Sequence, residues 1–213
     1  MKKFLAAIDQ GTTSSKVILF DLNGKIIFIS QKEFKQYFPN NGWVEHNPNE
    51  IWKTTLISLK KVIQKAKNLN GKILSIGITN QRETTVLWNK KNGKPIYNAI
   101  VWQDRRTTEY CKILKKKKFE NLFRKKTGLF IDPYFSATKV KWILDNVKNS
   151  KKLIKSNNLL FGTIDTFLIW KLTRGQMHLT ETSNASRTML FNIHSNKWDK
   201  ELLKKLKIPH EIL

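Results

Sequence analysis

The chain opens with short apolar runs that are separated by polar turns. Residues 4–8, 15–20 and 25–30 are three such runs; Gly-Thr-Thr-Ser joins the first two, and Asp-Leu-Asn-Gly joins the last two. Apolar runs of this length, bounded by turn residues, are typical of strands. We therefore predict three antiparallel strands at the start of the chain.

A helical period replaces this pattern after residue 46. Asn47 can cap a helix with Pro48 in its first position, and apolar residues then recur every three or four positions up to Ala66. This spacing predicts a helix that ends at about Lys67.

Strands and helices alternate in the remaining sequence. We predict a buried strand at 73–79, a second strand at 84–88 with a turn at 89–93, and a third strand at 159–161. Helices are predicted around residues 105–126, 136–147 and 163–173, the first of them as two segments joined by a lysine run at 115–118. This order indicates an α/β fold with a mixed sheet. With no internal repeat and no linker-like composition, we expect one domain over residues 1–213.

The amino-acid composition excludes several classes of protein and partner. The 213 residues are 40% hydrophobic, with 7 Trp and 12 Phe, which excludes a disordered, collagenous or disulfide-stapled chain. The net charge of +24 comes mostly from scattered lysines, because only six of the 40 basic residues are arginine. Phosphate and groove readers favour arginine, so we expect a solvated basic surface and no specific nucleic-acid partner.

Cysteine content and apolar run length indicate the compartment. Cys111 is the single cysteine, which excludes a disulfide framework and a thiolate metal cluster. The apolar run after Lys3 ends at Asp9, too early for a signal peptide, and no run is long enough to cross a membrane. We expect a cytoplasmic protein with no membrane partner.

A first candidate site is the stretch Asp-Gln-Gly-Thr-Thr-Ser-Ser-Lys at residues 9–16. Backbone N–H groups around Gly11 and the hydroxyls of Thr12, Thr13 and Ser14 could bind phosphate oxygens, with Asp9 holding a metal ion. The alternative is a hydroxyl-rich hairpin turn capped by Asp9. The residues alone favour neither interpretation.

Two further candidate sites combine charge and aromatic rings. Arg82 and Glu83 lie between two apolar strands, where a cation and a carboxylate could hold neighbouring hydroxyls of a polyol. Trp102 and Tyr134-Phe135 could pack on the carbon-bound hydrogens of such a ligand. The alternatives are a surface ion pair for Arg82 and Glu83, and core packing for the aromatic rings.

Several of these motifs resemble one known family. Residues 9–15 look like the N-terminal phosphate loop of the FGGY carbohydrate kinases, and residues 134–146 fit the first signature of that family, including Lys139 and Trp142. Residues 76–85, 93–103 and 184–192 are specifically similar to the glycerol kinases within it. The resemblance spans nearly all 213 residues.

The resemblance implies a fold, an activity and a set of roles. The fold would be an actin-like, ribonuclease-H-like pair of domains, of which this chain covers most of the first. The activity would be transfer of the γ-phosphoryl group of ATP to glycerol, with Mg²⁺ as cofactor and ADP as product. The implied roles are glycerol binding by Arg82, Glu83, Tyr134 and Trp102, nucleotide binding by Thr12, Thr13, Ser14 and Lys16, and metal binding by Asp9. Lys16 stands where the nearest relatives often carry arginine.

The same resemblance implies that part of the machinery lies elsewhere. The aspartate that accepts the proton in this family would lie beyond Leu213, as would the second domain, so we assign no catalytic residue and expect an N-terminal portion that is inactive alone. For the full-length protein we expect a homo-oligomer. The alternatives are another FGGY kinase acting on a longer polyol or sugar, and an inactive fragment with a non-specific basic surface.

Overall fold

The computed structural model describes residues 1–213 and divides them into two compact units. Unit 1 comprises Met1–Gln36 and Asn47–Gln81, and unit 2 comprises Tyr37–His46 and Arg82–Leu213. The chain passes between the units without a long polar linker, which is why its composition does not reveal the division.

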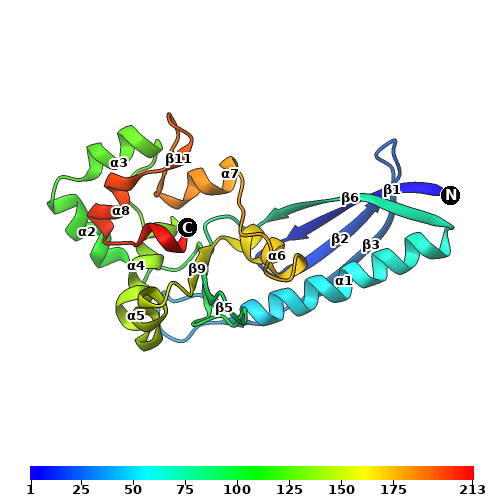
Figure 1. The fold of residues 1–213 in the computed structure, drawn as a ribbon, viewed down its shortest axis with the longest axis horizontal. Coiled ribbons are helices and arrows are strands. Elements are labelled where there is room, and N and C mark those ends of the chain that lie inside the picture. The colour runs from blue at the N-terminus through cyan, green and yellow to red at the C-terminus, as the bar shows by residue number, and fades with distance from the viewer. The chain divides into compact units, whose positions relative to one another are not determined.

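Unit 1 is a four-stranded mixed sheet with one long helix on one face (Figure 1). Its elements are β1 (Lys2–Gln10), β2 (Ser14–Phe20), β3 (Ile26–Glu33), α1 (Pro48–Asn68) and β6 (Gly71–Asn80). The strand order is β3-β2-β1-β6, with β1, β2 and β3 antiparallel and β6 parallel to β1. The predicted three-strand start and mixed sheet are confirmed.

Helix α1 begins and ends where the sequence predicts. The Asn47 side chain accepts a hydrogen bond of 2.9 Å from the backbone N–H of Asn49, and Pro48 occupies the first helical position. The apolar stripe of α1 packs on the sheet, and the Thr54 and Thr55 hydroxyls bond the buried Ser15 hydroxyl of β2. These bonds fix the start of β2 against the helix.

Strand β6 differs from the prediction in its burial. The sequence predicts a buried strand, but Leu74 is 47% and Ile76 39% exposed. The cause is position, because β6 is an edge strand with β1 as its single neighbour in the sheet. An apolar run alone does not distinguish a central strand from an edge strand.

Unit 2 is mainly helical and contains short strands in antiparallel pairs. The strands are β5 (Glu45–His46), β7 (Val86–Asn89), β8 (Ala99–Ile100), β9 (Leu159–Gly162), β10 (Phe191–Asn192) and β11 (Lys197–Trp198), with β4 (Gln36–Tyr37) at the boundary between the units. The pairs are β5 with β8, β7 with β9, and β10 with β11. The predicted strands at 84–88 and 159–161 are thus confirmed as β7 and β9.

Unit 2 has seven helices, most of which pack around a hydrophobic core. They are α2 (Thr108–Lys116), α3 (Glu120–Thr127), α4 (Ser136–Asn146), α5 (Lys148–Lys155), α6 (Ile164–Leu172), α7 (Thr182–Ala185) and α8 (Lys200–Leu206), with 3₁₀ turns at Ser186–Thr188 and His210–Ile212. Helices α2, α3, α4 and α8 supply much of that core, through residues such as Leu114, Phe123, Ile143 and Leu202. The lysine run does separate α2 from α3, and Lys118 takes a left-handed φ of 60° there.

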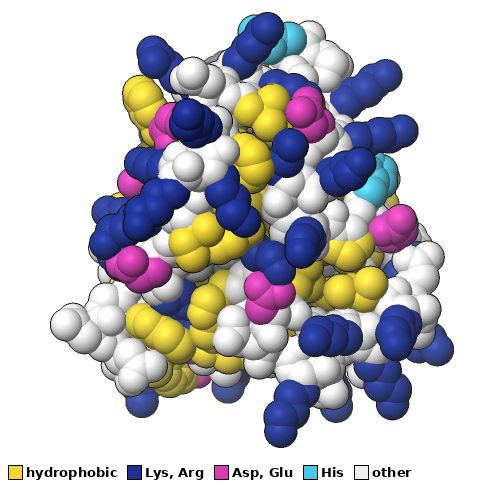
Figure 2. Space-filling model, turned by 90° about the vertical axis from the view of Figure 1, so that its left-hand side faces the viewer, with side chains coloured by type: hydrophobic (Ala, Val, Ile, Leu, Met, Phe, Trp, Pro, Cys, Tyr) yellow, Lys and Arg dark blue, Asp and Glu magenta, His cyan; other side chains and the backbone are white.

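Basic side chains are spread over the surface of unit 2. Figure 2 views the side that carries α2 and α3 and shows Lys and Arg distributed across it, with few acidic side chains and with apolar patches between them. Among the helices, none has both the length and the apolar character that a bilayer crossing requires. The absence of a specific nucleic-acid partner remains a prediction.

Candidate functional site

The hydroxyl-rich stretch of the first candidate site forms a tight hairpin loop between β1 and β2. The Gly11 N–H donates to the Ser14 carbonyl over 2.9 Å, so it closes the loop instead of pointing at a ligand. The Ser14 hydroxyl accepts a bond from the Gln31 amide, while Thr13 is exposed and its hydroxyl has no partner within the chain. Thr13 is therefore the loop hydroxyl most available to a bound anion.

The side-chain amides of two glutamines hold this hairpin in place. Gln10 is fully buried and Gln81 is 7% exposed. Both side chains donate to the Gly11 carbonyl, over 2.8 and 3.2 Å, and the Gln81 amide also donates to Gln10. Buried amides that satisfy one another hold the loop in one position. Neither glutamine is among the residues for which the sequence predicts a role.

Asp9 and Lys16, the predicted metal and phosphate residues, lie opposite each other on β1 and β2. Their side chains form an ion pair of 3.0 Å, and both are partly exposed. The loop therefore presents one carboxylate and one ammonium group beside its free hydroxyl. The two charges compensate each other, so the loop has no strong net charge of its own.

Glu83 is the most unusual residue of unit 2. It is 2% exposed, and its backbone takes a left-handed φ of 62°, which is rare for a residue with a side chain. The Ser136 hydroxyl donates to its carbonyl over 3.0 Å, and the Thr85 hydroxyl does so over 3.2 Å. Strained residues persist where their surroundings hold them, and they cluster at functional sites.

The partner of Glu83 is Arg187, and this excludes the alternative of a surface ion pair between Arg82 and Glu83. In the structure, Arg187 Nε donates to Glu83 Oε1 over 2.5 Å, while Arg82 is exposed and forms no ion pair. The side chains of neighbouring residues diverge here, and Arg187 is 104 positions away along the chain. Glu83 is thus not part of a surface ion pair, and the exposed Arg82 guanidinium is left free.

The three predicted aromatic rings gather around this ion pair. Tyr134 packs against Trp102 with ring centroids 5.5 Å apart and against Phe135 at 5.3 Å. The Arg187 guanidinium lies 5.0 Å from the Phe135 ring centre and 5.7 Å from that of Tyr134. Trp102 and Tyr134 are half-buried, whereas Phe135 is 9% exposed and belongs to the core. Tyr134, Phe135 and Arg187 also line a hollow of about 400 Å³.

The structure therefore brings together Glu83, Trp102 and Tyr134 and adds Arg187 to them. We call these four residues the polyol cluster, after the ligand that the family resemblance implies. Arg187 lies within the family-like stretch 184–192 but is not among the predicted site residues. One available signal was its residue type, because arginine is scarce in this lysine-rich chain.

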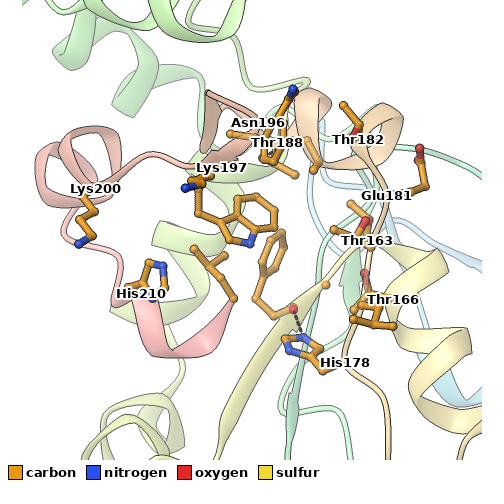
Figure 3. A pocket seen from close by; sticks show the side chains of 18 residues that line it. Thr163, Thr166, His178, Glu181, Thr182, Thr188, Asn196, Lys197, Lys200 and His210 are labelled. Atoms are coloured by element: carbon orange, nitrogen blue, oxygen red, sulfur yellow. Dashed lines mark hydrogen bonds between the residues drawn. The ribbon is translucent and has the colours of Figure 1, made fainter. Parts of the chain in front are cut away.

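Another cavity of unit 2 lies away from the polyol cluster and contains none of the predicted site residues. It measures about 640 Å³ and is lined by side chains such as Thr163, His178 and Glu181 on one side and Lys197, Lys200 and His210 on the other (Figure 3).

Several polar groups on one side of this cavity are already engaged in the fold. Thr163 and Thr180 donate to Asp165, whose pKa is raised by burial. Glu181 caps α7, and the His178 ring bonds the Phe161 carbonyl. We therefore favour the polyol cluster as the candidate site, because a carboxylate with a strained backbone is held in place there.

Comparisons with known proteins identify relatives over the whole chain. Residues 4–213 match the model of the N-terminal domain of the FGGY family of carbohydrate kinases. A glycerol kinase from a Geobacillus species is 58% identical over 213 residues, and one from Escherichia coli is 57% identical over 212 residues. Each alignment covers the whole chain but only 43% and 42% of the relative, so the chain spans less than half the length of these enzymes.

Solved structures give the same picture of the fold. A Plasmodium falciparum glycerol kinase with ADP superposes with a TM-score of 0.88 at 37% identity, covering 97% of this chain and 41% of that one. A gluconate kinase from Lactobacillus acidophilus gives 0.86 at 26% identity, covering 100% of this chain and 41% of that one.

Proposed function

Because this chain belongs to the FGGY family of carbohydrate kinases, we propose that it supplies the polyol-binding and phosphate-binding residues of a glycerol kinase. Its fold is the actin-like, ribonuclease-H-like α/β fold of that family, and residues 1–213 form its N-terminal domain in this proposal. The observation that carries the proposal is the polyol cluster, a buried carboxylate paired with arginine beside two half-buried rings.

The cluster has the chemistry that a small polyol requires. A glycerol hydroxyl is both a donor and an acceptor, so the Glu83 carboxylate would accept from hydroxyls while the free Arg82 guanidinium donates to them. Trp102 would pack on the carbon skeleton, and Tyr134 would add a hydroxyl next to it. These contacts would hold the polyol in one orientation and present one terminal hydroxyl for attack.

The hairpin of unit 1 would bind the nucleotide in this proposal. In the reaction the hydroxyl oxygen bonds to the γ-phosphorus, the bond from phosphorus to the bridging oxygen breaks, and ADP leaves as the hydroxyl proton departs. Thr12, Thr13 and Ser14 would donate hydrogen bonds to phosphate oxygens, and Lys16 would compensate their charge. We assign no proton acceptor within these residues.

Mg²⁺ fits the donor set at this hairpin. No group of three His, Cys, Asp or Glu side chains is arranged to hold a metal ion on its own. Mg²⁺ is commonly held by one or two carboxylates together with substrate phosphates and water, so the partly exposed Asp9 carboxylate is a sufficient protein ligand. When bound, the ion would neutralise charge on the phosphates.

A chimaeric enzyme tests the proposed activity. Residues 1–213 replace the matching part of the Geobacillus glycerol kinase, to which they are 58% identical, and ADP release is measured with glycerol, xylulose and gluconate. We expect glycerol to be preferred by at least about 100-fold in kcat/KM, because a site built to bond specific hydroxyls discriminates strongly. The unaltered Geobacillus enzyme is the control. A preference for xylulose or gluconate, or no turnover with any substrate, would contradict the proposal.

Replacing Thr13 by valine in this chimaera should weaken nucleotide binding alone. The substitution keeps the shape of the side chain but removes the one free loop hydroxyl, so we expect the KM for ATP to rise about 2- to 10-fold. The KM for glycerol should stay constant, because Thr13 is not part of the polyol cluster. Thr182→Val, at an exposed threonine of α7, is the matched control. An unchanged KM for ATP would favour the alternative of a purely structural hairpin turn.

A further inference from the structure

Lys139 is a fully buried lysine with no carboxylate as its hydrogen-bond partner. It lies in the first turns of α4, and its ammonium reaches back to two backbone carbonyls, Tyr134 over 2.5 Å and Phe135 over 3.2 Å. A positive charge near a helix N-terminus is unfavourable, and burying an ammonium group is costly. The position therefore requires an explanation other than stability.

The segment that Lys139 holds touches the polyol cluster at every residue. Tyr134 packs on Trp102, and Phe135 lies beneath the Arg187 guanidinium. The Ser136 hydroxyl donates to the carbonyl of Glu83. The 134–136 segment thus contains Tyr134 and contacts the other three members of the cluster, so its orientation decides where all four lie.

We infer that Lys139 is a positioning residue for the polyol cluster: its ammonium fixes the carbonyls of Tyr134 and Phe135 and thereby sets the Tyr134 ring against Trp102. The expected effect of Lys139 on glycerol kinetics rests on the proposed function. Its effect on the positions of the Tyr134 and Trp102 rings rests on the contacts alone. Lys139 itself touches no substrate and acts through residues 134–136.

The strength of the hydrogen bonds from Lys139 to the Tyr134 and Phe135 carbonyls should depend on pH. Burial lowers the pKa of Lys139 to about 7, and the neighbouring Asp104, Glu83, Cys111 and Asp132 partly oppose that effect. These groups face Lys139 from the loops after β6 and β8, from α2 and from the loop before α4; Asp104 and Glu83 are themselves paired with Arg106 and Arg187. As the pH rises through 7, the ammonium loses a proton and its bonds to the carbonyls weaken. The cluster should therefore be best ordered below pH 7.

The first test observes Trp102 directly in the 213-residue chain by NMR. The indole N–H signal is assigned by its loss in Trp102→Phe and followed from pH 6 to 8.5 in the wild type, in Lys139→Met and in Lys141→Met. Lys141 is a matched control on the same helix, where it pairs with Asp145. We expect the wild-type and Lys141→Met signals to move with a midpoint near pH 7. The Lys139→Met signal should be displaced at pH 6 and stay constant with pH.

Two results of this test would overturn the inference. One is a Lys139→Met signal with the position and pH dependence of the wild type. The other concerns Lys139→Arg, which keeps a permanent charge and serves if the methionine variant fails to fold. Its Trp102 signal should be independent of pH, and a titration like that of the wild type would contradict the assignment.

The second test separates the inference from the proposed function. In the chimaeric enzyme, Lys139→Met should raise the KM for glycerol about tenfold at pH 6 and leave the KM for ATP within about twofold. The wild-type KM for glycerol should rise with pH, and this rise should be absent in the variant. If the chimaera phosphorylates glycerol but Lys139→Met behaves like the wild type, the positioning role is wrong and the function stands. If the chimaera is inactive, the proposed function fails and the Trp102 signal decides the structural part.

Discussion

Replacing Arg106 by leucine should lower the free energy of unfolding by about 3 to 5 kcal/mol, the cost of breaking a buried charge network from one side. The Arg106 side chain is fully buried and bonds Asp104 through two nitrogens, each over 2.9 Å, and Glu45 over 2.7 Å. Its guanidinium also packs against the Trp43 and Trp142 rings, at 3.8 and 4.6 Å from their centres. Leucine would leave two buried carboxylates without a counter-charge.

Urea unfolding of the 213-residue chain measures this loss, and the neighbouring arginine provides the control. Arg105 has a side chain 56% exposed that pairs with Asp132, so Arg105→Leu should cost no more than about 1 kcal/mol. Equal losses in the two variants would show that the network around Arg106 contributes little to stability. If Arg106→Leu does not fold, Arg106→Lys is informative, because it keeps the charge but loses the two-nitrogen contact with Asp104.

Replacing Glu83 by glutamine in the chimaeric enzyme should lower kcat/KM for glycerol by roughly 10- to 150-fold. Glutamine keeps the size and one acceptor oxygen but removes the charge, and a hydrogen bond to a charged group contributes about 1.5 to 3 kcal/mol. The loss also leaves the Arg187 guanidinium without its carboxylate partner. The KM for ATP should change little, because the hairpin of unit 1 is assigned to the nucleotide.

The control for this variant is Glu109→Gln, a substitution of an exposed carboxylate on α2 in the same unit. It should leave both KM values unchanged. Glycerol kinetics within about twofold of the wild type in Glu83→Gln would mean that the Glu83–Arg187 pair is structural and that the polyol assignment is wrong.

Elements specified by local signals were predictable from the sequence. The caps and apolar stripe of α1 and the turns between β1, β2 and β3 are encoded within a few residues. Helix α5 was missed because its eight residues contain only Leu153 and Ile154 as apolar positions. Helix α8 was missed as well, although Asp199 caps it with bonds to the Glu201 and Leu202 N–H groups.

The residues of the candidate site were likewise predictable only where local sequence signals specified them. Residue types and order indicated Glu83, Tyr134 and Trp102, and the family resemblance gave them roles. The Glu83–Arg187 pair and the burial of Lys139 were not predictable, because both arise from tertiary packing between segments that carry no local sign of it. Position 83 also shows that two residues adjacent in the sequence need not form an ion pair, since adjacent side chains in an irregular segment diverge.

The left-handed backbone of Glu83 has a consequence for laboratory evolution of this chain. An L-amino acid at a φ of 62° costs of order 1 kcal/mol or more, whereas glycine adopts it freely and asparagine more easily than glutamate. This cost is opposed by the ion pair with Arg187, since a hydrogen bond to a charged group contributes about 1.5 to 3 kcal/mol. Libraries selected for heat tolerance alone should therefore replace Glu83 by glycine or asparagine only together with a replacement of Arg187. Libraries selected for activity should retain glutamate there and gain their stability at other positions.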